Sequence, residues 1–172
     1  MRVNNLKELE GILKKKIQKT LETEVKDTLR DIVVDHIFTD VYDSYAPNIY
    51  RRRQTQSGAN INSPFDNTSK TGLLDPNNLK FTFDGKGGIS VQNVAVGSKY
   101  YFSNGKTYIS KNAGLPIANV IETGNGYDSS NWEYDGVPRP FMKNSYMDLK
   151  VNHYHTQALK LGLQEQGLEV RW

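Results

Sequence analysis

The sequence of 172 residues predicts an α+β fold, in which a small antiparallel β-sheet is packed by a long N-terminal helix and a C-terminal helix, with long polar loops. Three observations predict this class. Apolar residues recur at helical spacing over residues 4–43, apolar residues alternate over 79–83 ahead of strong turn signals, and a second helical pattern covers 141–166. The length is that of one ordinary domain, so we expect a single domain over 1–172.

The N-terminal segment predicts one long amphipathic helix over residues 4–43. At about 1.5 Å per residue this helix would be about 60 Å long, which is more than a compact domain of this size needs. The apolar spacing drifts between three and four without clean heptads, which favours a helix facing its own core over a two-stranded coiled coil. Its basic residues Lys14–Lys16 and Lys19 are interleaved with acids, which favours a solvated face over a nucleic-acid patch. The apolar positions are Leu6, Leu9, Leu13, Ile17, Leu21, Val25, Leu29, Ile32 and His36/Ile37.

Residues 44–78 lack periodicity and predict an extended loop rich in Ser, Asn, Gly, Pro and Tyr. Tyr50, Arg51, Arg52 and Arg53 interleave an aromatic ring with basic groups, as a nucleic-acid contact does. The other interpretation is that the nearby tyrosines pack on the end of the long helix while the arginines pair with its acids or with a neighbouring subunit. We favour this second interpretation.

Residues 79–121 predict a sheet of about four strands. Leu79–Phe83 and the strand that begins at Ile89 form a hairpin with a bulge near Asn93. Asn104-Gly105 predicts a second hairpin within 99–110, and the apolar run 117–121 predicts the last strand. The turn Gly85-Lys86-Gly87-Gly88 lacks the glycine spacing and the Lys-Ser/Thr of a phosphate-binding loop.

Residues 122–140 predict a polar loop that is stiffened where it enters the last helix. Trp132 and Tyr134 lie at its tip, and Arg139 lies between Pro138 and Pro140, which restrict the backbone on both sides. We expect Phe141 to anchor the start of a helix over 141–166.

The residue types of a reactive or metal-binding site are scarce. There is no cysteine, and no G-x-S-x-G nucleophile turn. We interpret Glu122 as holding a neighbouring backbone or an arginine, and His153 and His155 as solvent-exposed or capping residues instead of metal ligands. We therefore expect no enzyme activity, no cofactor and no metal.

Charge and hydropathy give two further expectations. The net charge of +3 is too small to indicate nucleic-acid binding by itself. Neither a signal peptide nor an apolar run of membrane-spanning length occurs in the sequence, so we expect a protein made and kept in a cytosol, with no membrane partner.

Several segments together resemble a known protein family. They are the Lys- and Glu-rich first helix, VYDSYAPNIYRRR, a K-T-G-L-L lead into the first strand, V-x-N-V-A, A-N-V-I-E-T-G-N-G-Y, V-P-R-P-F-M and a final L-x-x-Q-G-L-E-V. This pattern resembles the tail-completion or head–tail joining (neck) proteins of long-tailed bacteriophages. Residues 120–124 and 138–142 are the best-matching pieces. The polar loop over 50–76 and the aromatic hairpin are longer than in the shortest members of that family.

The resemblance implies a virion structural protein that forms a homo-oligomeric ring, with sixfold symmetry expected, in the neck between head and tail. Its implied partners are other copies of the chain, the neighbouring connector or stopper, and the tail tube or tail terminator. DNA would pass through the ring without sequence-specific binding, and the protein would be in the host cytoplasm during assembly. The candidates for inter-subunit or partner contacts are Tyr50, Arg51, Arg52, Arg53, Trp132, Tyr134, Arg139 and Phe141. The alternative is a phage-encoded binding protein that inhibits a host or defence factor.

Overall fold

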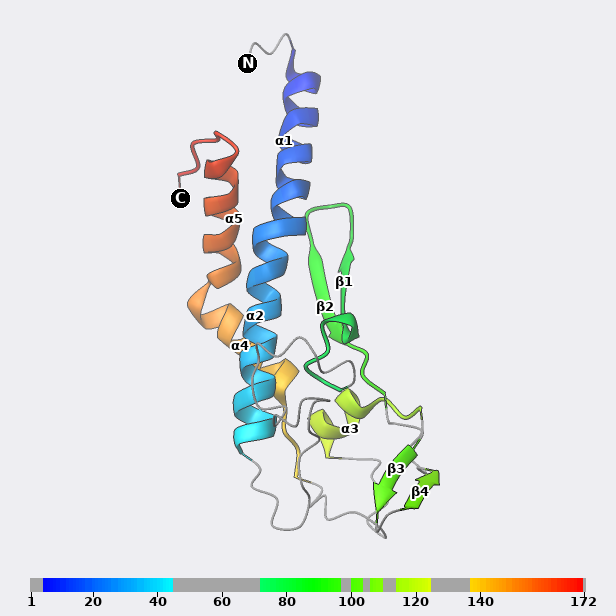
Figure 1. The fold of residues 1–172 in the computed structure, drawn as a ribbon. Helices are drawn as coiled ribbons and strands as arrows, with labels where there is room; N and C mark the ends of the chain where they lie inside the picture. The colour runs from blue at the N-terminus through cyan, green and yellow to red at the C-terminus, as the bar shows by residue number, and fades with distance from the viewer. Residues whose placement is uncertain are drawn as a thin grey trace. The chain divides into compact units, whose positions relative to one another are not determined.

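The computed structural model describes residues 5–44, 72–96, 100–103, 106–109, 114–124 and 137–171. It contains both helices and paired strands, which confirms the α+β class (Figure 1). The chain divides into two compact units. One consists of Met1–Ile32, Phe81–Val91 and Met147–Trp172, and the other of Val33–Lys80 and Gln92–Tyr146. The expected single domain stays a prediction.

The N-terminal helix contains two π-helical segments that the sequence pattern did not predict. Its parts follow one another without a break: α1 (Leu6–Thr20), η1 (Leu21–Val25), α2 (Lys26–His36) and η2 (Ile37–Asp43). The helix begins at Asn5, whose side-chain Oδ1 accepts a hydrogen bond of 2.8 Å from the backbone N–H of Glu8.

A repeat of four residues explains the π-helical segments. Because an α-helical turn holds about 3.6 residues, each step of four overshoots a full turn by about 40°, and five steps overshoot by about 200°. A π-helical turn closes i→i+5 hydrogen bonds and holds more residues, so it turns the later side chains back toward the buried face. The expected place of Ile32 on the apolar stripe is wrong, since Val33 is fully buried and Ile32 is half-buried. The buried apolar residues are Leu21, Val25, Leu29, Val33, Ile37 and Val41.

In the first unit, α5 (Tyr154–Glu165) runs antiparallel to α1 and contacts both α1 and η1 (Figure 1). Gly162 permits this approach, because a Cβ atom on it would lie 2.5 Å from Cγ2 of the buried Thr20. Gln166 Nε2 donates to Thr20 Oγ1 at 2.6 Å and to the Lys16 carbonyl at 3.1 Å. The hydrophobic core of this unit consists of Leu21, Val25, Leu29 and Ala158. Partly buried apolar residues pack against it, namely Ile17, Phe81, Phe83, Ile89, Leu149 and Leu159.

The described strands form two separate pairs, so the expectation of one sheet of about four strands is wrong. β1 (Leu79–Phe83) pairs with β2 (Ile89–Asn93) in a hairpin. β3 (Tyr100–Ser103) pairs antiparallel with β4 (Lys106–Ile109), with Ser103 opposite Lys106. This register confirms the second hairpin that Asn104-Gly105 predicted.

The predicted strand over 117–121 is wrong, because these residues form the short helix α3 (Ile117–Thr123). Pro116 precedes the helix and accepts a hydrogen bond of 3.1 Å from the N–H of Val120. Gly124 ends it in the left-handed conformation, at φ 70°, and donates its N–H to the Val120 carbonyl. These terminal signals outweigh the strand preference of the β-branched residues between them.

The predicted bulge near Asn93 is also wrong, because β2 ends at this residue. The buried Asn93 side chain donates Nδ2 to the Leu73 carbonyl at 2.8 Å and accepts the N–H of Ala95 at 3.0 Å. The backbone pairing continues one residue beyond β2, where the N–H of Val94 donates to the Asn78 carbonyl at 2.8 Å. Val96 forms an isolated bridge with Pro116.

The predicted C-terminal helix over 141–166 is divided in two. α4 (Phe141–Asn152) ends before His153, and α5 begins after it. His153 has a positive φ of 55°, which interrupts the right-handed helix at a residue type that tolerates this conformation better than most.

Candidate partner-contact site

The first turn of α4, in the second unit, follows a short ribbon without regular secondary structure, residues 137–140. Phe141 is the first residue of the helix and is fully buried, so its ring anchors the turn. Pro140 precedes it and accepts the N–H of Asn144 at 2.8 Å. Ser145, also buried, donates its hydroxyl to the Phe141 carbonyl at 2.6 Å. The helix therefore starts at a position set by the burial of one aromatic ring.

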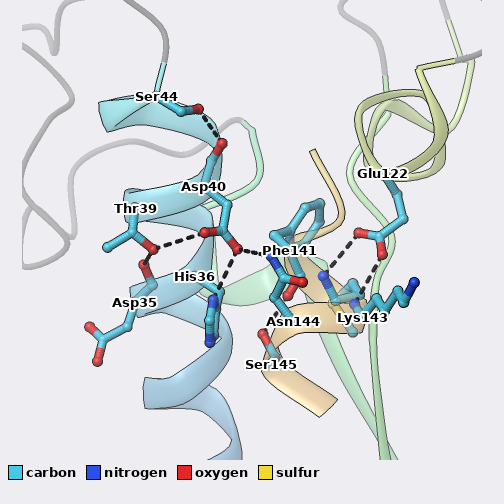
Figure 2. A network of polar contacts seen from close by, with 11 residues as sticks. Asp35, His36, Thr39, Asp40, Ser44, Glu122, Phe141, Lys143, Asn144 and Ser145 are labelled. Atoms are coloured by element: carbon cyan, nitrogen blue, oxygen red, sulfur yellow. Dashed lines mark hydrogen bonds and ion pairs between the residues drawn. The ribbon is translucent and has the colours of Figure 1, made fainter. Parts of the chain in front are cut away.

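Glu122, at the end of α3, caps this helix. Its Oε2 accepts the N–H of Met142 at 2.9 Å and its Oε1 accepts the N–H of Lys143 at 3.0 Å (Figure 2). The first N–H groups of a helix have no partner within it, and a carboxylate there also interacts favourably with the helix dipole. The interpretation that Glu122 holds a neighbouring backbone is thus confirmed.

A backbone hydrogen bond lies beside this cap. The N–H of Arg139 donates to the Ile121 carbonyl at 2.8 Å. Together with Glu122, it joins the end of α3 to the ribbon and first turn of α4. These bonds join the described residues that precede and follow segment 125–136, the segment that carries Trp132 and Tyr134, and we call this set of contacts the loop-base clamp.

Asp40, from η2, holds the same turn of α4 through Asn144. Asn144 Nδ2 donates to Asp40 Oδ2 at 2.9 Å, and His36 Nδ1 lies 2.9 Å from the same oxygen. Since a carboxylate can only accept, Nδ1 is the donor. Thr39 Oγ1 donates to the other carboxylate oxygen at 3.3 Å, and Ser44 Oγ donates to the Asp40 carbonyl. Figure 2 shows that the α4 turn thus lies between two carboxylates, those of Asp40 and Glu122.

The structure places two of the predicted contact residues at this turn. Arg139 and Phe141 belong to the ribbon and the start of α4, and both are buried, with 8% and 0% of their surface exposed. In this conformation Phe141 supports the site from inside and does not present its ring to a partner. Tyr50, Arg51, Arg52, Arg53, Trp132 and Tyr134 lie outside the described residues.

The Asp40 side of the site was not predicted from the sequence. His36 and Asp40 are four residues apart, a spacing that brings two side chains together on a helix and that could have indicated the pair. Asn144 is 104 residues away from Asp40, and nothing in the local sequence indicates that they meet.

The two histidines of the C-terminal segment belong to the first unit. The rings of His153 and His155 are 6.4 Å apart, centroid to centroid. His153 precedes α5 without a side-chain cap bond, and it is exposed. Of the two expectations, a capping residue or a solvent-exposed residue, the second is the one that holds for His153. Within the described ranges, no group of three or more His, Cys, Asp or Glu residues is placed to hold a metal ion.

Comparison with known proteins gives the family. A family model described as YomN matches residues 5–165. The chain belongs to the YomN family. A Bacillus subtilis (strain 168) relative, the SPbeta prophage-derived uncharacterized protein YomN, is 30% identical over 139 residues, which cover 79% of this chain and 73% of that protein. No solved structure matches the chain.

The match to YomN supports the phage origin that the resemblance implied. The matched family is described as YomN and not as a head–tail joining family, so the resemblance to neck proteins is supported only as far as this origin. Among the described helices of this YomN-family chain, none is both long and apolar enough to span a membrane.

Proposed function

We propose that this YomN-family protein is a structural component of the phage neck, where copies form a ring that joins the DNA-filled head to the tail. The observation that carries the proposal is the loop-base clamp, considered together with the prophage origin of the relative. In the clamp, both carboxylate oxygens of Glu122 accept backbone N–H groups, so this side chain positions the start of α4. Such an architecture suits a protein that presents a segment to a partner.

The proposal assigns separate roles to the residues of the site. Phe141, Glu122 and Asp40 fix the first turn of α4, and segment 125–136 with Trp132 and Tyr134 makes the contact. Aromatic side chains are enriched at protein interfaces, where they contribute a large share of the binding energy. Tyr50–Arg53 is a second proposed contact, with a neighbouring subunit or ring.

The experiment is a deletion of the gene in a phage that encodes this protein, followed by electron microscopy of the lysate. We expect filled heads and complete tails that are not joined, and normal joining after the gene is supplied in trans. Mass spectrometry of purified wild-type particles should detect the protein. Normal particles from the deletion, or particles without the protein, would refute the neck role, and capture of a host protein by the free chain would then favour the inhibitor alternative.

Variants at the proposed contact residues test the site itself. Trp132→Ala with Tyr134→Ala should leave the fold intact but fail to restore joining in the deletion phage, because the contact surface is lost. Leu161→Ala, which changes an exposed apolar residue of α5, is the matched control and should restore joining. If the double variant restored joining as well as the control, these two aromatic residues would have no part in the contact.

A further inference from the structure

The longest stretch of the sequence without an acidic residue runs from Gly85 to Ile121. It contains four lysines, in a chain whose 22 basic residues are otherwise nearly balanced by 19 acidic ones. Unbalanced positive charge of this kind attracts an anionic partner, although the charge alone does not say which one. The four lysines are Lys86, Lys99, Lys106 and Lys111.

The β3–β4 hairpin belongs to this stretch and is built from a repeated pattern (Figure 1). Residues 99–103 read KYYFS and residues 106–110 read KTYIS, so the pattern Lys-x-Tyr-apolar-Ser occurs once on each side of the turn. Because the two strands run antiparallel, the second copy of the pattern runs opposite to the first. The repeat therefore brings its two tyrosines together.

The register gives the two faces of the hairpin different compositions. Tyr101 pairs with Tyr108, and Ser103 pairs with Lys106. Since neighbouring positions of a strand alternate between its faces, these four positions share one face, which we call the tyrosine–lysine face. The other face is more apolar and is the one expected to turn toward the protein's own chain. Its positions are Tyr100, Phe102, Thr107 and Ile109.

The hairpin has little support from the rest of the described chain. Among the described helices and strands, β3 and β4 have an extensive contact with each other and with no third element. A two-stranded hairpin by itself is only marginally stable in water. A ligand bound to one of its faces would stabilise it.

We propose that the tyrosine–lysine face binds single-stranded nucleic acid without preference for its sequence. Proteins that bind single strands combine basic groups, which neutralise phosphates, with aromatic rings on which successive bases stack. Tyr101 and Tyr108 supply rings at paired positions, and Lys106 supplies a cation on the same face. Phosphates with stacked bases account for both the lysines and the tyrosines, whereas an acidic protein segment accounts for the lysines alone. The binding does not depend on the neck role, which is proposed for other residues.

Fluorescence anisotropy of a labelled oligothymidylate with the purified full chain tests the proposal. We expect binding at low salt that weakens as the salt concentration rises, because lysines displace counterions from the phosphates. An abasic strand of the same length carries the same phosphates without bases, so it should bind at least about tenfold more weakly. No binding of the oligothymidylate at low salt, or equal binding of the two strands, would overturn the proposal.

Substitutions at the paired tyrosines separate stacking from charge. Tyr101→Leu with Tyr108→Leu should weaken binding of oligothymidylate at least about tenfold and leave binding of the abasic strand unchanged, because the rings are lost and the lysines are kept. Tyr101→Phe with Tyr108→Phe keeps the rings and should bind as the wild type does. Tyr154→Leu, which replaces an exposed tyrosine of α5, is the matched control and should change neither affinity. Equal affinities of the leucine and phenylalanine variants for oligothymidylate would refute stacking on this face.

Lys106→Gln tests the charged part of the face. It should weaken binding about three- to tenfold at low salt and reduce the slope of log affinity against log salt concentration by about 0.7, the value for one phosphate on a single strand. Lys150→Gln, which replaces an exposed lysine of α4, should leave the slope unchanged. An unchanged slope in Lys106→Gln would remove this lysine from the site. Binding of a labelled oligoglutamate as tight as that of oligothymidylate would show that the face recognises negative charge alone, and would assign it to an acidic protein instead of a nucleic acid.

Discussion

The two C-terminal helices are held in different ways. α5 lies against α1 and η1 by close fit, with Gly162 against Thr20 and a core of leucine, valine and alanine beneath. α4 is held at its first turn by side-chain oxygens, those of Glu122 on two backbone N–H groups and that of Asp40 on Asn144. The first contact depends on volume, and the second depends on the placement of polar groups.

This difference suggests a division of labour within the chain. A close-packed helix pair tolerates little change of volume, since even one methylene group is felt in a well-packed interior. A capped helix end contributes less free energy, but it determines where the chain enters the helix and hence where the preceding segment is anchored. The following predictions separate the two kinds of contact, beginning with the largest expected effect.

Phe141→Ala should have the largest effect, because the ring is fully buried beneath the capped turn. We expect a loss of about 3–5 kcal/mol in the free energy of unfolding, measured by urea denaturation. Tyr146→Ala, on the same helix but 61% exposed, is the control and should change stability by less than about 1 kcal/mol. Equal effects of the two variants would mean that α4 is held by its caps and not by the buried ring.

Gly162→Ala should have the next largest effect, because the new methyl group would lie 2.5 Å from Cγ2 of Thr20 and 3.2 Å from Oε2 of Glu24. We expect a loss of about 1–3 kcal/mol by urea denaturation, as for other overpacked sites. Thr20→Ser removes that Cγ2 atom and keeps the hydroxyl that Gln166 contacts. The double variant should therefore recover part of the loss, and strictly additive effects would show that the Thr20 methyl group is not the obstacle.

Glu122→Ala should cost less, about 0.5–2 kcal/mol, because it leaves two N–H groups of α4 without their carboxylate. Hydrogen exchange of the Met142 and Lys143 amides should increase, while the amides of α5 should not change. Glu122→Gln keeps one acceptor oxygen, so its stability and its amide exchange should lie between those of the wild type and those of Glu122→Ala. If exchange at Met142 and Lys143 were unchanged in Glu122→Ala, solvent would be replacing the cap without cost.

The long N-terminal helix was predicted from the sequence, but its close contact with α5 at Gly162 was not. The apolar repeat predicted a long N-terminal helix. Because its spacing was interpreted as drifting between three and four, neither the strict repeat of four from Leu21 to Val41 nor the π-helical segments that follow from it were predicted. Over 117–121 local preference favoured a strand, and the proline before and glycine after it favoured a helix. In so short a segment, the proline and the glycine at its ends determine that it is helical.

The candidate site could be predicted only in part, because the residues that meet in it are far apart in the sequence, and farther on the Asp40 side than on the Glu122 side. Glu122 was expected to hold a backbone, since a carboxylate after an apolar run needs a donor nearby. Its partners are 20 and 21 residues away, and Asn144 meets Asp40 across 104 residues. Such distant pairs depend on the packing of whole elements, which no local pattern reports.

The β1–β2 turn repeats the polar kind of contact on a smaller scale and gives the smallest effect. Asp84 Oδ1 accepts the N–H groups of Lys86 at 2.7 Å and of Gly88 at 2.8 Å. Hydrogen bonds from Gly88 and then Lys86 hold the pKa of the exposed Asp84 carboxyl below its usual range. Because the pKa is lower in the folded hairpin than in the unfolded chain, the carboxylate stabilises the turn above the unfolded pKa of about 3.9, and this contribution is lost as the pH falls through the folded pKa.

An NMR titration should therefore place the midpoint of the Asp84 carboxyl below the usual value of about 3.9, with the Gly88 amide shifting at the same midpoint. Gly88→Ala should return the midpoint toward that value, because its Cβ atom would lie 2.9 Å from the Asp84 carboxyl carbon and displace the group from the amide. Asp84→Asn keeps an acceptor without a titrating charge, so it should abolish the pH dependence of the Gly88 signal. A wild-type midpoint at the usual value would show that the exposed turn is hydrated rather than capped, and that carboxylate capping in this chain needs the partial burial that Glu122 has at α4.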